Sequence, residues 1–159
     1  FVYGGHQERG RRGGTESVPL IASLGTAANL ARKKTASFDR DVRPLRDALE
    51  QGILTKIPHT ELNSHPVQRL ANTTNITFPS IESEALLLLL DQAGICASSG
   101  SACLADSPDP SHVVAAMKPG SAAARQWVRF SLGSGNTTAE IRDAIAAIQR
   151  SIASLGGTR

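Results

Sequence analysis

The sequence predicts a mixed α/β fold, because segments with helical hydrophobic spacing alternate with segments of strand character along its 159 residues. Apolar residues at every third or fourth position mark the helices. β-Branched residues in 72–78 and an apolar–polar alternation in 127–132 mark the strands. With 40% hydrophobic residues, the chain can bury a core in one compact domain, with room for an appendage.

The first half of the chain is predicted to contain a loop and two helices. Residues 4–14 form a loop rich in glycine and arginine, after which Thr15 is placed to cap a helix. A second helix is predicted over about 39–52, where Pro44 either starts the helix or kinks it. The apolar positions of the first helix are Leu20, Leu24, Ala27 and Ala31.

The second half is predicted to alternate strands and helices. A strand over 72–78 precedes a helix over 80–93, whose unbroken leucine run predicts burial on more than one side. We expect a short strand at 95–97, a loop over 98–110 and a helix from near Ser111. After the strand 127–132, Thr137 and Glu140 form a capping-box pattern that starts the last helix.

Composition and charge narrow the class of protein. The net charge of +3 is concentrated around residues 9–12, which indicates a local basic spot and no nucleic-acid-binding face. The longest apolar run, 85–90, is far too short to span a membrane. Two cysteines favour a reducing cytoplasm over a secreted disulfide scaffold. The start at Phe1, without an initiator Met or a signal-peptide pattern, suggests a truncated chain.

The two cysteines are expected to differ in role. Cys103 lies among serine, glycine and alanine residues, where packing gives no reason for a cysteine, so its thiol is a candidate nucleophile. The alternative is an unreactive loop cysteine. Cys96 follows Ile95 on the predicted short strand and is expected to be a small core residue. We therefore expect Cys103 to be the more reactive thiol.

Three further features have a functional and a structural interpretation. The loop 4–15 leads into a helix, where backbone N–H groups favour an anion, but it could equally be a solvated basic turn. Arg129 on a half-buried strand needs a partner, either a structural carboxylate or the carboxylate of a substrate. His112 at a helix start is best explained as an exposed first-turn residue. A zinc site with Cys96, Cys103 and His112 follows no usual ligand spacing, so no metal is predicted.

Several motifs together resemble the NifS and IscS cysteine desulfurases, a family with the aspartate-aminotransferase fold. They are GGHQERGRRGGTE at 4–16, SSGSAC at 98–103 followed by PSHV at 110–113, and VRFSL at 128–132. RLANTTN at 69–75 and IESEAL at 81–86 also fit in order and spacing. The resemblance covers almost the whole chain.

The resemblance implies a homodimeric enzyme dependent on pyridoxal 5'-phosphate that converts L-cysteine to L-alanine. Cys103 matches the residue that receives the sulfur as a persulfide, and Arg129 the arginine that binds the substrate carboxylate. Thr15 matches a residue that reaches the cofactor phosphate of the neighbouring subunit. An iron–sulfur scaffold protein would accept the sulfur. The implied fold is an α/β (α+β) small domain with a short, mostly antiparallel sheet flanked by helices.

The same resemblance implies that residues 1–33 are the tail of the large cofactor-binding domain and residues 34–159 the small C-terminal domain. The family's cofactor-binding lysine lies upstream of Phe1, and no lysine of this chain has a matching context. We therefore expect this chain alone to be inactive and to hold no cofactor. The alternative is a non-catalytic sulfur-relay or scaffold-binding module without pyridoxal phosphate.

Overall fold

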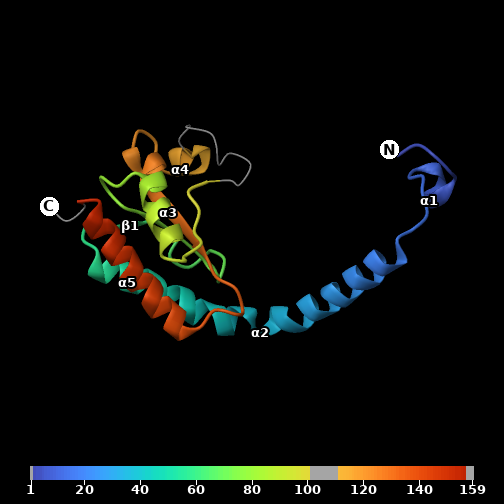
Figure 1. The fold of residues 1–159 in the computed structure, drawn as a ribbon, viewed down its shortest axis with the longest axis horizontal. Coiled ribbons are helices and arrows are strands. Elements are labelled where there is room, and N and C mark those ends of the chain that lie inside the picture. The colour runs from blue at the N-terminus through green and yellow to red at the C-terminus, as the bar shows by residue number, and fades with distance from the viewer. Residues whose placement is uncertain (1, 101–110, 157–159) are drawn as a thin grey trace. The chain divides into compact units, whose positions relative to one another are not determined.

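The structure is a computed structural model that describes residues 2–100 and 111–156. The chain divides into two compact units, Phe1–Ser37 and Phe38–Arg159 (Figure 1). Helix α1 (Gln7–Gly10) belongs to the first unit, and helix α2 (Val18–Lys56) begins there and continues into the second. Among the described residues, no helix has the length and apolar character needed to cross a membrane.

Helix α2 differs from the prediction in its extent. It is one helix of 39 residues that contains Pro44, where two separate helices were expected. The residues between the two predicted helices, 32–37, include neither glycine nor proline, so nothing in them ends the helix. The predicted capping by Thr15 is also wrong, because the helix begins at Val18, after Ser17.

The second unit contains a three-stranded antiparallel sheet in the order β1-β2-β3. Strand β1 is Glu61–Leu62, β2 is Thr73–Thr77 and β3 is Trp127–Ser131. The register pairs Asn75 with Arg129 and Ile76 with Val128. This sheet and its helices confirm the predicted α/β class with a short antiparallel sheet, whereas strand β1 was not foreseen.

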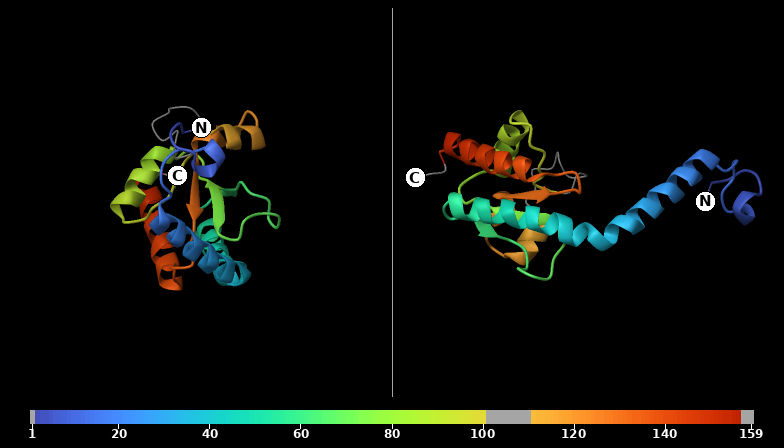
Figure 2. Two further views of the ribbon diagram at one scale, coloured as in Figure 1. Left: turned by 90° about the vertical axis from the view of Figure 1, so that its right-hand side faces the viewer. Right: turned by 90° about the horizontal axis from the view of Figure 1, so that it is seen from below.

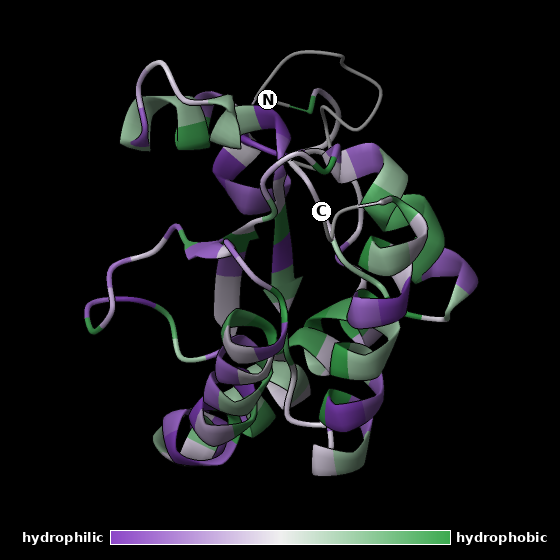
Figure 3. Cartoon of the chain, turned by 90° about the vertical axis from the view of Figure 1, so that its left-hand side faces the viewer, coloured by the Kyte–Doolittle hydropathy of each residue, from purple (hydrophilic) through white to green (hydrophobic). Residues whose placement is uncertain are grey.

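The main hydrophobic core lies on one face of this sheet. Helices α3 (Ser83–Gln92) and α5 (Thr138–Ser154) pack there with the second half of α2 (Figure 2). Because side chains alternate along a strand, Val128 and Phe130 reach this core from β3. The alternation is visible as green and purple bands along the strands in Figure 3. The core residues on the helices include Val42, Leu49, Ile53, Leu86, Leu90, Ile141, Ile145, Ile148 and Ile152.

Helix α5 has the predicted cap, and the burial of helix α3 differs between its sides. The capping box of α5 is confirmed, since the Thr137 hydroxyl accepts from the Glu140 N–H and the Glu140 carboxylate accepts from the Thr137 N–H. In α3, Leu86 and Leu90 are buried while Leu88 is 60% exposed. Leu87 and Leu89 are half-buried, so burial extends to either side of the stripe of Leu86 and Leu90, while Leu88 faces solvent.

A smaller cluster covers the other face of the sheet at one end. Helix α4 (His112–Met117) and the 3-10 helix η2 (Ala122–Arg125) pack around Trp127. The Trp127 indole N–H donates to the Ala124 carbonyl at 3.2 Å. Beyond Trp127, this face of the sheet carries polar residues, and that is where the candidate site lies.

Candidate functional site

Arg129 lies in the middle of β3 on the polar face of the sheet. Val128 and Phe130, its neighbours along the strand, belong to the core, so the Arg129 side chain projects from the opposite face. The residue is half-buried. Its side chain has no hydrogen bond or ion pair with any residue in the described parts of the chain. The structure therefore provides no carboxylate partner for this guanidinium within 2–100 and 111–156, which favours the ligand interpretation over the structural one.

The backbone of Arg129 anchors the segment that leads towards Cys103. Ser98 and Arg129 exchange two hydrogen bonds, from Ser98 N to Arg129 O at 3.1 Å and from Arg129 N to Ser98 O at 2.7 Å. The Ser98 hydroxyl also donates to the Gly100 carbonyl at 3.0 Å. The chain thus enters the loop directly beside the candidate substrate arginine. Cys103 itself lies outside the described residues.

The far end of the same loop is attached close by. The Ser111 N–H donates to the Ala124 carbonyl at 3.1 Å, and the Ser111 hydroxyl accepts from the Val114 N–H as the cap of α4. Ala124 lies beside Trp127 in the small cluster on the polar face. His112, the first residue of α4, is exposed, as the sequence indicated. Both described ends of the loop are therefore hydrogen-bonded to β3 or to its immediate support.

Cys96 contradicts its prediction, because it is exposed and lies in no strand. Residues 95–97 have no ladder partner, and pairing begins at Ser98. Ile95 and Ala97 are partly buried against the main core. Cys96 lies between them but is exposed, so its side chain points away from this core. The burial of its neighbours in the sequence therefore did not indicate burial of Cys96 itself.

Thr15 lies in the first unit, in the segment between the glycine-rich loop and α2. Its side chain is exposed and has no hydrogen-bond partner among the residues described, so its hydroxyl is available to a ligand. Several neighbouring polar groups of the loop are paired with one another. The Gly14 N–H donates to Gln7 Oε1 at 3.2 Å, and Arg12 contacts the Gly14 carbonyl at 2.6 Å and Glu16 at 3.4 Å.

The backbone of this loop is used internally as well. The N–H groups of Gly10, Arg11 and Gly13 donate to carbonyls within residues 2–8. A Cβ on Gly13 would come within 2.7 Å of the Gly4 Cα, so the close approach of the two chain segments requires glycine. The loop is therefore shaped by its own hydrogen bonds, and these N–H groups are not available to an anion.

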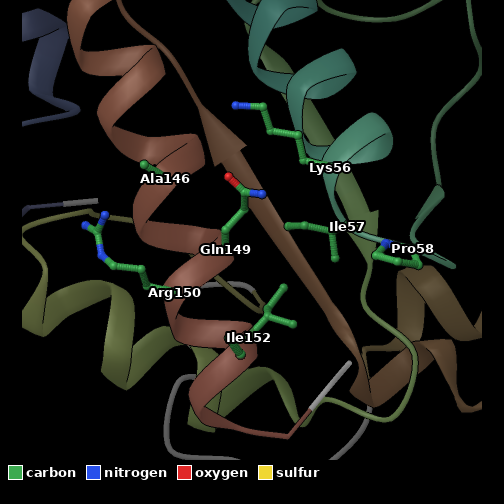
Figure 4. Close-up of a pocket in the computed structure, with 8 residues that line it drawn as sticks. Lys56, Ile57, Pro58, Ala146, Gln149, Arg150 and Ile152 are labelled. Carbon is green, nitrogen blue, oxygen red and sulfur yellow. The ribbon is translucent and has the colours of Figure 1, made fainter. Parts of the chain in front are cut away.

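A surface hollow of about 480 Å³ lies elsewhere, between the end of α2 and α5. Lys56 and Gln149 line it, with Ile57 and Ile152 contributing its apolar surface. Figure 4 shows the Gln149 side chain directed towards Lys56, while Arg150 extends to the other side of Gln149. No residue predicted to act in catalysis or binding lines this hollow.

Similarity to known proteins identifies the family. Residues 4–143 match the aminotransferase class-V family. The chain belongs to the class-V aminotransferases. This class-V chain is 54% identical over 141 residues to cysteine desulfurase 2 of Trichormus variabilis and 49% identical over 155 residues to cysteine desulfurase NifS of Azotobacter vinelandii. These matches cover 89% and 98% of the chain but 35% and 39% of the relatives.

Solved structures of NifS-like proteins have the same fold as this chain over the part that they share. A NifS-like protein from Rickettsia africae is 34% identical with a TM-score of 0.80, over 96% of this chain and 39% of that one. A second NifS-like protein is 27% identical with a TM-score of 0.81. The class-V chain thus spans less than two fifths of the length of these relatives, and it matches the portion that the sequence motifs indicated.

One polar residue beside Arg129 was not predicted from the sequence. On the polar face of β2, Asn75 lies opposite Arg129 and is linked by a hydrogen bond to Asn63. The signal was present in the strand 72–78, where Thr73, Asn75 and Thr77 alternate with Thr74 and Ile76. This alternation places Asn75 beside Arg129 only when the pairing of β2 with β3 is known.

Proposed function

We propose that this chain is the C-terminal part of a cysteine desulfurase, which converts L-cysteine to L-alanine and transfers the sulfur to Cys103. The observation that carries the proposal is the half-buried Arg129 on the polar face, without a carboxylate partner in the described chain, next to the anchor of the Cys103 loop. The similarity to named cysteine desulfurases at about half identity supports it.

Arg129 would bind the α-carboxylate of L-cysteine. A guanidinium presents parallel N–H donors that match the two oxygens of a carboxylate, and a partly buried position strengthens that pairing relative to open solvent. Holding the carboxylate fixes the position of the substrate thiol. Because Ser98 pairs with Arg129, the same strand that would bind the substrate anchors the start of the loop that carries Cys103.

Cys103 would act as the nucleophile. Its thiolate attacks the substrate sulfur, so that an S–S bond forms and the bond between that sulfur and the substrate β-carbon breaks. The Cys103 sulfur is oxidised to a persulfide, and the β-carbon is reduced and takes up a proton to give L-alanine. The net change is L-cysteine plus the Cys103 thiol to L-alanine plus the Cys103 persulfide, which needs no external oxidant.

Pyridoxal phosphate, which the family implies, would supply the electron sink for these bond changes at the substrate. The available residue of this chain fits it in one respect, because the Thr15 hydroxyl is exposed and unpaired within the described residues and can donate to a phosphate oxygen. We further propose that Thr15 serves the cofactor of a second subunit in a homodimer, and that an iron–sulfur scaffold protein in the cytoplasm accepts the sulfur.

The test uses the full-length protein with its cofactor. Incubation with L-cysteine and a reductant should release sulfide and L-alanine in equal amounts. Arg129→Ala should raise KM for L-cysteine, since loss of a bidentate carboxylate contact costs about 2–5 kcal/mol. Arg142→Ala, which removes an exposed arginine of α5, is the matched control and should behave like the parent.

Two outcomes would contradict the proposal. If the full-length protein forms no L-alanine from L-cysteine, the chain is not part of a desulfurase and the non-catalytic sulfur-relay alternative gains support. If Arg129→Ala keeps the parent KM, the guanidinium has a structural role and the carboxylate is bound elsewhere.

A further inference from the structure

The polar face of the sheet presents a second group beside Arg129. Alternation along β2 and β3 places Asn75 on the same face as Arg129, and the register pairs the two residues directly. Asn75 is half-buried, and so is Arg129. An amide and a guanidinium therefore project side by side from the centre of the sheet.

The backbone hydrogen bonds show which kind of pair this is. Arg129 uses both its N–H and its C=O on Ser98, on the side away from β2. The Asn75 carbonyl accepts from the Asn63 N–H at 2.9 Å, on the side away from β3. Asn75 and Arg129 are thus a non-hydrogen-bonded pair, the type in which opposite Cα atoms are only about 4.5 Å apart and side chains are closest.

A chain of side-chain hydrogen bonds fixes the orientation of the Asn75 amide. The Thr77 hydroxyl donates to Asn63 Oδ1 at 2.9 Å, and Asn63 Nδ2 donates to Asn75 Oδ1 at 2.7 Å. Thr77 and Asn63 are 4% and 6% exposed, so this chain is shielded from water. With its oxygen engaged, Asn75 keeps two Nδ2–H donors, and no residue in the described chain accepts from them.

We propose that Asn75 is a second binding residue for the substrate carboxylate, donating from Nδ2 to the carboxylate that Arg129 binds. This inference rests on the proposed function. A neutral amide adds a donor next to the guanidinium without adding a second positive charge that would repel it. Two donors from adjacent strands contact the carboxylate from two directions, which fixes its rotation as well as its position.

The sharpest variant is Asn75→Asp, which keeps the shape and the acceptor for Asn63 Nδ2 but replaces the free donors by a negative oxygen. In the full-length holoenzyme it should raise KM for L-cysteine by about tenfold to a hundredfold, with a smaller change in kcat, because a hydrogen bond to a charged group is lost and the new carboxylate repels the substrate and competes for Arg129. Asn136→Asp is the matched control. It makes the same charge change in an exposed turn, keeps the acceptor for the Gly133 N–H and loses only the contact of its amide with the Glu140 carboxylate at the start of α5.

A binding measurement makes the test independent of turnover. Isothermal titration of the full-length protein should show that Asn75→Asp weakens L-alanine by about tenfold to a hundredfold. Ethylamine, which is L-alanine without its carboxylate, should bind the parent and the variant equally. Asn75→Thr, a β-branched replacement suited to a strand, provides a second variant and should show the same loss for L-alanine.

The possible outcomes separate the two proposals. If the parent forms no L-alanine from L-cysteine, the proposed function fails. If the parent is active but both Asn75 variants keep its KM and its affinity for L-alanine, the inference about Asn75 is wrong. Full affinity in Asn75→Asp together with a loss in Asn75→Thr would also overturn it, because the amide would then present its oxygen to Arg129.

Discussion

Breaking one buried ion pair should strongly destabilise the second unit. Glu50 of α2 and Arg69, whose side chains are 5% and 7% exposed, are joined at 2.7 Å. The Thr74 hydroxyl of β2 donates to the second Glu50 oxygen at 2.6 Å. In Glu50→Gln, Arg69 would remain buried without its carboxylate. Breaking a buried pair from one side typically costs about 3–5 kcal/mol, and we expect a loss of this size in the free energy of unfolding.

The dependence on pH follows from the pKa of Glu50. Burial by itself raises this pKa, but the hydrogen bonds from Arg69 and Thr74 and the nearby positive charges outweigh burial and lower it below the ordinary value of 4.5. A lowered carboxyl pKa stabilises the folded state above the unfolded pKa of about 4.3, and that stabilisation is lost as pH falls through the folded pKa. The difference in stability between parent and Glu50→Gln should therefore narrow below about pH 4.

Urea unfolding followed by fluorescence of Trp127, the single tryptophan, measures both effects. Asp39→Asn is the control on the same helix, because it removes an exposed carboxylate from an arginine partner, Arg43, and should leave stability unchanged. The double variant Glu50→Gln with Arg69→Met should be more stable than the sum of its single changes predicts. A Glu50→Gln variant as stable as the parent, or a stability difference that does not change with pH, would refute this reasoning.

Three further predictions follow from individual contacts. Gly52→Ala should not stabilise the chain, although alanine has the better helix propensity, because the added Cβ would lie 2.3 Å from Ile145 Cδ1. Adding Ile145→Val, which removes that Cδ1 atom, should recover stability in denaturant titrations. The 159-residue chain should bind a hydrophobic dye and associate, because apolar residues of α2 within 18–30 are more than 50% exposed; low dye binding and a clean monomer would contradict this. Cys103→Ser in the full-length protein should abolish sulfur transfer, whereas Cys96→Ser should retain it in assays of sulfide release.

Local patterns predicted those elements whose ends and faces depend on nearby residues. The capping box at Thr137 and Glu140, the apolar stripe of α5 and the alternation of β3 are all set within one helical turn or a few strand positions. Strand β2 was predicted by its β-branched residues. The two-residue strand β1 was missed, because Glu61 and Leu62 have no periodicity of their own and become a strand only by pairing with β2.

The candidate site was predictable only where a single residue type carried the signal. An arginine in an apolar strand stands out in the sequence, so Arg129 was found. Asn75 could not be found in this way, because its proposed role depends on its pairing with Arg129 and on its hydrogen bond from Asn63, and both partners are distant in the sequence. The first residue of α2 was predicted wrongly because of a local ambiguity. Thr15 and Ser17 are both good capping residues, and local preference does not choose between them.

The exposure of Cys96 changes how the two thiols must be distinguished. Cys96 is exposed and lies two residues before Ser98, which pairs with Arg129, whereas its neighbours Ile95 and Ala97 pack against the main core. Rapid alkylation of Cys96 would therefore be compatible with Cys103 as the sulfur acceptor, because Cys96 is itself accessible to a reagent. What separates them is which thiol can reach the sulfur of a substrate held by Arg129. Sulfur transfer in the two single serine variants decides this question, and alkylation rates do not.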